Sequence, residues 1–273
     1  MRKAIALIVF HMLFANFISM NNGARTLGMG NAFFALADRP SSIFYNPAGM
    51  ARINNYSIVG SHQNLYNISG LYSNMMAISL PSPYFRTGFA IQRLGLEDVY
   101  YEQIIYVSTA GIIKLKNVPI RFGASLKYKS IEINNYDNVS NPSSIDLDFG
   151  LILDLSDNIF LGYSVKNLLN PTYIFISYEN QIKNIHGFGI SYNWQESVNF
   201  LADYIINDEV RYWNLGSEMW FYDVFAARLG LNDEKLTIGF GIKTKIWLID
   251  AAIVAHEELG STYRISLGCS FVK

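Results

Sequence analysis

The C-terminal stretch Thr262–Phe271, TYRISLGCSF, decides the fold, because apolar residues alternate with small or polar ones along its whole length. One face would carry Tyr263, Ile265, Leu267, Cys269 and Phe271, and the other Thr262, Arg264, Ser266, Gly268 and Ser270. Successive side chains of a β-strand point to opposite sides. The stretch therefore predicts a strand with one face in an apolar environment.

The same alternation recurs along the chain, for example at 85–92, 120–129, 187–193 and 236–246. No helical period of 3.6 residues competes with it there. We expect an all-β, antiparallel fold of about 14 strands, which begin near Asn54, Leu71, Phe85, Tyr101, Val118, Ser144, Asn158, Ile182, Val198, Arg211, Val224, Lys235, Ile249 and Ser261.

Such strands fit either a soluble β-sandwich or a transmembrane β-barrel. Composition separates the two, because hydrophobic residues make up 51% of the chain and charged residues only 16%, against about 25% charged in an ordinary soluble domain. Charged strand residues fall on the small-residue face, where a barrel has its lumen. The sequence thus favours a transmembrane barrel over a secreted sandwich.

The amino terminus predicts export. Arg2 and Lys3 precede an apolar stretch that ends near Ile18, which is typical of a secretory signal peptide. We expect a signal peptide over 1–20, with the cleavage site unassigned, and a single barrel domain over 21–273. Since no other apolar segment approaches the length of a spanning helix, the expected location is the outer membrane of a diderm bacterium, with its lipid as a partner.

Connection lengths give the expected orientation. The longest connections, near 134–142 and 168–183, both follow odd-numbered strands, whereas the joints after even-numbered strands are short. Outer-membrane barrels have short periplasmic turns and longer outer loops. With an even number of strands, both ends of the barrel domain would lie in the periplasm.

A barrel of this size has room inside for a further segment. We expect 21–52, which mixes small and apolar residues, to fold into the lumen as a plug, or hatch. Pro40 and Ser41 predict a short helix there. Asn46, Pro47, Ala48 and Gly49 predict a turn, in which the asparagine caps its own backbone.

The same segment carries a family resemblance. GARTLGMG at Gly23–Gly30, NPAG at Asn46–Gly49 and the stretches DFGLILDL and LGYSVKNLLNP within 148–171 resemble the long-chain fatty-acid transporter (FadL-like) superfamily of outer-membrane proteins, especially its PorV/PorQ-like branch. The chain departs from that pattern at Asn31, where the family has a small, glycine-like residue, and at Arg39-Pro40, where it is commonly acidic. The resemblance implies a fourteen-stranded barrel with an internal hatch.

The resemblance leaves two functions open, because the superfamily includes passive transporters of hydrophobic compounds and accessory components of protein secretion of the type IX kind. Transport would use an apolar pocket lined from the hatch by Leu27, Met29, Phe33, Phe34, Phe44, Tyr45 and Met50. The alternative is that these residues only pack the hatch against the wall. Secretion would instead need a protein-docking surface, for which the apolar loop cluster Tyr173, Ile174, Phe175, Ile176 and Tyr178 is the candidate. The alternative for this cluster is that the seventh and eighth strands extend beyond the membrane there.

Charged residues of both signs fall on the expected lumen face, so we expect internal ion pairs that join hatch and wall rather than a selectivity filter. They are Arg86, Arg121, Lys127, Lys129, Lys166, Arg228, Lys243, Lys245 and Arg264, with Asp146, Asp148, Asp154, Asp203, Glu218 and Asp250.

The sequence gives little support for other classes of function. The histidines His11, His62, His186 and His256 are scattered without metal-ligand spacing, and no catalytic constellation is evident. We expect no enzyme activity, cofactor or metal. The net charge of −1 gives no reason to expect nucleic acid as a partner. The expected partner besides lipid is a hydrophobic small molecule or a secreted protein.

Overall fold

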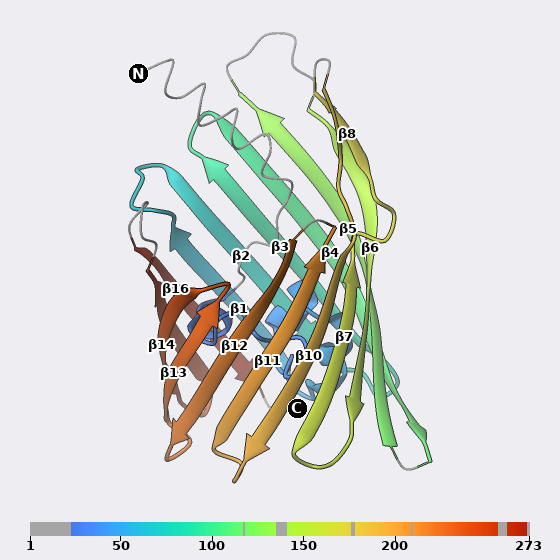
Figure 1. Cartoon of the computed structure of the whole chain (residues 1–273), viewed down its shortest axis with the longest axis vertical. Helices are drawn as coiled ribbons and strands as arrows, with labels where there is room; N and C mark the ends of the chain where they lie inside the picture. Colours follow the sequence, from blue (N-terminus) through green and yellow to red (C-terminus); the bar gives the residue numbers. More distant parts are fainter. Residues whose placement is uncertain are drawn as a thin grey trace.

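The computed structural model describes residues 23–116, 118–134, 141–175, 178–208, 210–255 and 261–271. Its centre is a closed antiparallel barrel in which β16 pairs with β1 and Tyr56 lies opposite Phe271 (Figure 1). The wall strands are β1 (Tyr56–Asn64), β2 (Leu71–Leu80), β3 (Arg86–Leu96), β4 (Tyr100–Leu115), β5 (Val118–Ile133), β6 (Ser143–Asp154), β7 (Ile159–Lys166), β10 (Ile185–Trp194), β11 (Val198–Asn207), β12 (Val210–Phe221), β13 (Phe225–Asn232), β14 (Lys235–Lys243), β15 (Trp247–Val254) and β16 (Thr262–Phe271). The predicted all-β, 14-strand barrel is confirmed.

The predicted strand starts agree closely with the observed ones. The largest difference is at the eighth wall strand, which was expected near Ile182 and begins at Ile185. Alternation is a local property of the chain, so strand positions can be predicted from it without knowledge of the strand partners. The predicted signal peptide, 1–20, lies outside the described residues.

The structure adds one hairpin that strand alternation did not predict. β8 (Thr172–Phe175) and β9 (Tyr178–Gln181) form a separate two-stranded sheet between β7 and β10. Tyr173 is only 2% exposed, and its hydroxyl is hydrogen-bonded to Ser144 Oγ. The docking-patch interpretation is therefore wrong for Tyr173, because its side chain lies in the interior and not at the surface. The side chains of the other residues in that cluster lie outside the described part of the chain.

Alternation sorts the wall residues as expected. Ile265 is 62% exposed on the outside of β16, whereas Arg264 and Ser266 face inward and are 3% and 2% exposed. The same contrast runs around the barrel, where the exposed side chains are predominantly aliphatic and aromatic. An apolar exterior around a polar interior is the arrangement of a membrane barrel rather than of a soluble one.

The two ends of the barrel differ. At one end, here the turn end, short connections join β2 to β3, β4 to β5, β6 to β7, β10 to β11, β12 to β13 and β14 to β15. The opposite end, here the loop end, has the longest connections, at 134–142, 167–184 and 255–261. Exposed aromatic residues gather near the turn end, including Tyr84, Phe85, Trp194, Tyr222 and Trp247, as expected of an interfacial girdle.

Among the described residues, three short helices precede the barrel: α2 (Ala24–Gly28) and the 3₁₀-helices η1 (Pro40–Phe44) and η2 (Pro47–Arg52). Proline occupies the first position of η1 and of η2, where its fixed φ suits helix initiation. Within the described residues, no helix is long and apolar enough to cross a bilayer.

Candidate functional site

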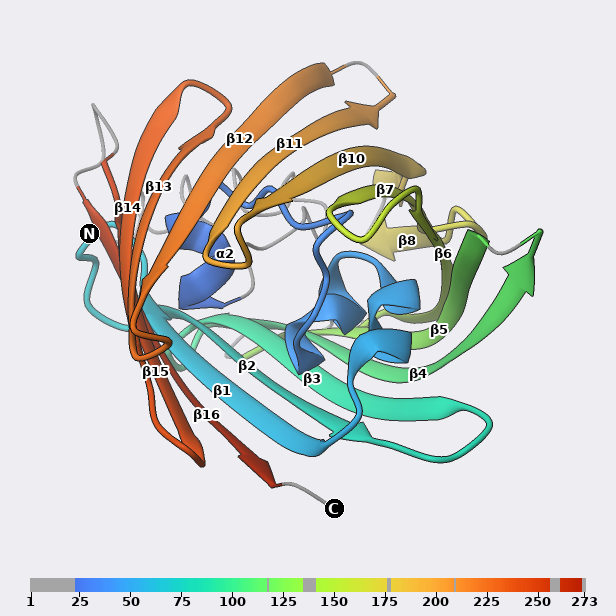
Figure 2. The same cartoon turned by 90° about the horizontal axis from the view of Figure 1, so that it is seen from below.

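Residues 23–55, here the N-terminal segment, lie inside the ring of strands (Figure 2). Helix α2 contacts β13 to β16, whereas η1 lies against β1 to β3 and η2 against β3 to β6. The segment thus touches walls on both sides of the lumen. Most of its apolar side chains form one buried cluster with inward-facing wall residues.

The N-terminal segment fits the wall so closely that several contacts leave no room for a side chain. A Cβ on Gly123 would lie 2.5 Å from the backbone nitrogen of Ala48, and one on Gly150 would lie 1.9 Å from Asn46 Oδ1. A Cβ on Gly28 would lie 2.8 Å from the Cα of Gly239. Glycine at these inward positions is therefore explained by direct approach of the segment.

The predicted turn Asn46–Gly49 is the start of η2. Asn46 caps it, since Asn46 Oδ1 accepts a hydrogen bond from Ala48 N at 3.1 Å. Asn46 Nδ2 donates to Phe34 O at 2.8 Å and to Leu151 O of β6 at 3.1 Å. One side chain thus ties η2 to the wall and to the preceding turn, and these contacts account for Asn46 without a ligand.

The turn at 33–37 is held by side chains rather than by a regular hydrogen-bond ladder. Asp203 Oδ2 of β11 accepts from the backbone nitrogens of Phe33 and Phe34 at 2.6 and 2.9 Å. Arg52 Nη1 donates to the carbonyl oxygens of Ala35 and Leu36. Buried backbone groups require such partners, so Asp203 and Arg52 fix the position of the phenylalanines.

A chain of buried ion pairs joins the segment to β12, β13 and β15 near the turn end. Arg25 pairs with Asp38 of the segment and with Glu218, whose Oε1 lies 2.7 Å from Arg25 Nη2. Arg228 links Glu218 to Asp250 at 2.8 and 2.9 Å. The predicted ion pairs between the inner segment and the wall are confirmed here.

Charge complementarity keeps Arg25 ionised. Burial opposes the charge of Arg25, but the carboxylates of Asp38 and Glu218 outweigh it and hold the pKa of Arg25 above its usual value. Arg39 adds another ion pair between the segment and the wall, with its Nη1 2.7 Å from Asp250 Oδ2. A buried pair that loses one partner is strongly destabilised, so these contacts anchor α2 and the stretch before η1.

Further inward-facing charges pair within the wall. Lys129 Nζ lies 2.7 Å from Asp146 Oδ2, and Lys127 Nζ lies 2.5 Å from Asp148 Oδ1. Asn167, just beyond β7, accepts hydrogen bonds from both lysines. Asp154 pairs with Arg121 of the wall and with Arg52 of the segment. In contrast, Lys243 and Lys245 are exposed near the turn end.

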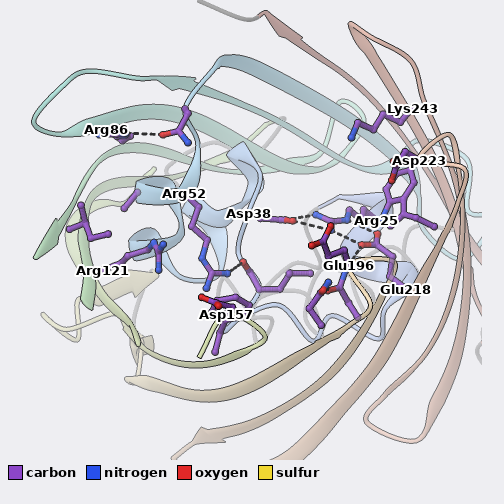
Figure 3. A pocket seen from close by; sticks show the side chains of 18 residues that line it. Arg25, Asp38, Arg52, Arg86, Arg121, Asp157, Glu196, Glu218, Asp223 and Lys243 are labelled. Atoms are coloured by element: carbon purple, nitrogen blue, oxygen red, sulfur yellow. Dashed lines mark hydrogen bonds and ion pairs between the residues drawn. The ribbon is translucent and has the colours of Figure 1, made fainter. Parts of the chain in front are cut away.

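A cavity of about 670 Å³ opens between the segment and the turn end (Figure 3). Its lining carries charges of both signs, and apolar atoms contribute the smaller part of its surface. The charged lining residues are Arg25, Asp38, Arg52, Arg86, Arg121, Asp157, Glu196, Glu218, Asp223 and Lys243. We call it the charged vestibule. An apolar ligand gains little in such a lining.

The seven residues expected to line a ligand pocket are all buried, but they do not form one site. Leu27 packs with Ala24 and Ala252, and Phe34 packs with Ile185 and Ile205. The remaining five, Met29, Phe33, Phe44, Tyr45 and Met50, belong to the main cluster. Most of this surface is therefore filled by packing between segment and wall.

Three of the seven border a small cavity on the loop-end side of the segment, which we call the inner pocket. Phe34, Phe44 and Tyr45 contribute from the segment. The wall and the segment add residues that sequence reasoning did not assign to a pocket: Asn31, Lys166, Ile185, Ile205, Tyr212, Asn214 and Asn232. Its volume of about 30 Å³ is room for about one water molecule, so an organic ligand would have to displace a side chain.

Two of these missed residues gave a sequence signal. Lys166 was assigned to the lumen face, and Asn31 stood out as a departure from a glycine-like position. Asn31 has a φ of +60°, a left-handed conformation that glycine adopts freely and asparagine tolerates. Its Oδ1 accepts from the Tyr45 hydroxyl at 3.1 Å. The asparagine thus keeps the backbone turn and adds a polar contact.

Over the part of the chain that the structure describes, no group of three or more His, Cys, Asp or Glu side chains is arranged to hold a metal ion.

Comparison with known proteins gives a match in structure alone. No model of a protein family matches the chain, and no curated protein matches it in sequence. The solved structure of the CymD monoaromatic hydrocarbon channel matches with a TM-score of 0.63 at 12% identity, covering 91% of this chain and 96% of that one. The toluene transporter TbuX of Ralstonia pickettii matches with a TM-score of 0.60 at 11% identity, covering 93% and 98%.

A FadL homologue of Pseudomonas aeruginosa matches with a TM-score of 0.57 at 12% identity, covering 91% of this chain and 98% of that one. These three structures are described as a channel, a transporter and a FadL homologue, and none as an enzyme. At such low identity the comparison establishes a shared fold. The chain has the barrel fold of FadL-like hydrocarbon transporters.

Proposed function

We propose that the protein resides in the outer membrane of a diderm bacterium and allows hydrophobic small molecules to pass passively, without enzymatic activity. The observation that carries this proposal is a closed barrel, apolar on the outside, with the fold of solved hydrocarbon channels. The PorV/PorQ-like branch suggested by the sequence resemblance stays a prediction.

The proposed membrane placement follows from the barrel surface. Exposed aliphatic and aromatic residues surround the wall, and aromatic residues gather near the turn end. In hydrocarbon, every backbone polar group needs a partner, and a closed ring of paired strands supplies it. By the rule that periplasmic turns are short, the turn end faces the periplasm and the loop end faces outward.

In this proposal the N-terminal segment, which overlaps the hatch predicted over 21–52, acts as a plug. Its close glycine contacts and its ion pairs with β12 and β15 support the assignment. Of the proposed ligand residues, Phe34, Phe44 and Tyr45 are favoured, because they border the inner pocket. Leu27, Met29, Phe33 and Met50 would take part only if the segment moves.

The proposal is tested by uptake into cells that carry the protein in the outer membrane. We expect faster entry of toluene than in cells without it, and unchanged entry of a hydrophilic sugar. Ile205→Phe, which fills the inner pocket, should slow toluene entry. Ile238→Phe is the matched control, since Ile238 is exposed on the outside of β14. Equal entry with and without the barrel would refute the proposal.

The secretion-accessory alternative gains no support from the compared structures, whose descriptions name channels and transporters. Its candidate docking residue Tyr173 is buried. We therefore propose a hydrophobic small molecule, and not a secreted protein, as the partner besides membrane lipid.

A further inference from the structure

Lys166, the last residue of β7, places a half-buried ammonium group beside two aromatic rings of the N-terminal segment. Its Nζ lies 5.5 Å from the ring centroid of Phe34 and 5.4 Å from that of Tyr45. All three residues line the inner pocket. Within about 6 Å, a cation is attracted to the negative face of an aromatic ring.

Lys166 differs in its partners from Lys127 and Lys129, the two buried lysines among the described residues of the lumen. Lys127 and Lys129 each form ion pairs with carboxylates of β6. Over the described ranges, no carboxylate lies within ion-pair distance of Lys166. The close contacts of its ammonium group are those with the rings of Phe34 and Tyr45. The nearest candidates are already engaged, Asp148 with Lys127 and Asp203 with the backbone nitrogens of Phe33 and Phe34.

The position of Phe34 shows how a ligand would use this cation. Its ring lies against the backbone of Gly187, where an added Cβ would come within 2.3 Å of Phe34 Cζ, and it packs on Ile185 and Ile205. A solute larger than water enters the inner pocket only by displacing a side chain such as this ring. The cation then loses one of its two π faces.

We propose that Lys166 is a specificity-determining residue, which makes the inner pocket favour solutes with an aromatic ring over saturated solutes of the same size. An aromatic solute that replaces the Phe34 ring restores the lost cation–π contact. A saturated ring restores only the apolar contacts with Ile185 and Ile205. An ammonium that loses one of its two π faces loses part of its stabilisation, so the saturated solute is disfavoured. The inference rests on the proposed transport of hydrophobic molecules.

The test compares toluene with methylcyclohexane, which share a seven-carbon skeleton but differ in π electrons. Purified barrel in liposomes is assayed for entry of each solute, with protein-free liposomes correcting for passive partition. We expect a corrected toluene preference of roughly 2- to 30-fold, the range that a cation–π contact supports. Lys166→Met should abolish the preference, whereas Lys166→Arg should retain it. Lys243→Met is the matched control, because Lys243 Nζ lies 5.8 Å from the Trp220 ring centroid but borders the charged vestibule.

A second measurement does not depend on the folding of a Lys166 variant or on the movement of Phe34. Phe34→Ala leaves space next to Lys166, and its direct binding of the two solutes is measured by calorimetry in detergent. Tighter binding of toluene supports the inference. Equal binding there, or an uptake preference unchanged by Lys166→Met, overturns it while transport stands. Entry of neither solute above protein-free liposomes, with no binding by Phe34→Ala, refutes the proposed function as well.

Discussion

The two sides of the N-terminal segment are built from different interactions. Towards the turn end, the segment is held by the ion pairs of Arg25, Asp38 and Arg39 beside the charged vestibule. Towards the loop end, aromatic and aliphatic side chains surround the inner pocket, and Lys166 is the cation there. Ion pairs and close backbone contacts fix position, whereas apolar contacts are not directional. The contrast suggests that the segment is anchored on one side and yields on the other.

The largest effect is expected from breaking the anchored side. Glu218→Gln leaves Arg25 and Arg228 buried with less compensating charge. Removing one partner of a buried pair costs about 3–5 kcal/mol, so the free energy of unfolding should fall by roughly that amount in urea titrations of the detergent-solubilised barrel. Glu234→Gln in the exposed β13–β14 connection is the control. Equal stability of the two variants would show that the ion chain does not anchor the segment.

The next effect tests the close contacts between segment and wall. Gly123→Ala places a Cβ 2.5 Å from backbone atoms of η2, so the segment or strand must shift, at a cost of about 1–3 kcal/mol. In Gly60→Ala the nearest atom lies 3.9 Å away, and we expect little change. Thermal unfolding of both variants gives the comparison. An unchanged unfolding temperature of Gly123→Ala would mean that η2 does not pack tightly against β5.

A smaller effect is expected where a single carboxylate holds the turn at 33–37. Asp203→Asn keeps an acceptor but loses the charge assistance to the Phe33 and Phe34 nitrogens, which weakens each hydrogen bond. Amide hydrogen exchange at these two residues should accelerate by about tenfold, the equivalent of 1.4 kcal/mol. Asp208→Asn, in the half-exposed pair with Lys183, is the control. Unchanged amide hydrogen exchange in Asp203→Asn would show that Asn46 and Arg52, rather than Asp203, stabilise the turn.

The smallest effect concerns the hairpin β8–β9. Tyr173→Phe removes the hydroxyl that is bonded to Ser144 but keeps the buried ring. The loss should be about 1 kcal/mol, seen as faster proteolysis within 167–184 while the barrel stays intact. Tyr84→Phe, at a residue 83% exposed, should leave proteolysis unchanged. Equal proteolysis rates of Tyr173→Phe and Tyr84→Phe would show that packing alone holds the hairpin.

Much of the wall was predictable from the sequence, and the limits have identifiable causes. The strand starts at Leu71, Val118, Val198 and Lys235 coincide with prediction, because each depends on its own alternating run. The hairpin after β7 was missed, since its apolar cluster reads equally well as an exposed patch or an extended strand. Only the neighbouring Ser144 of β6 and the buried cluster decide that Tyr173 points inward.

The sequence predicted which kinds of interaction the candidate site contains, but not which residues form them. Mixed charge in a confined lumen predicted ion pairs, yet the partners of Arg25 and Arg39 lie on strands about 200 residues away along the chain. Seven apolar residues of the segment were expected to line one pocket, but Phe34, Phe44 and Tyr45 border the inner pocket whereas Leu27 packs in a separate cluster. Asn31, Lys166 and Tyr212 converge there from separate parts of the chain.

The sequence by itself determined the strands, their inner and outer faces, the short helix that begins at Pro40 and the turn at Asn46–Gly49, because period-2 alternation, proline placement and asparagine capping act within a few residues. The tertiary structure alone decided which charges pair, which glycines face the segment and which cation remains among aromatic rings. Those outcomes depend on how barrel closure brings distant strands within a few ångströms of one another, a distance that no local pattern encodes.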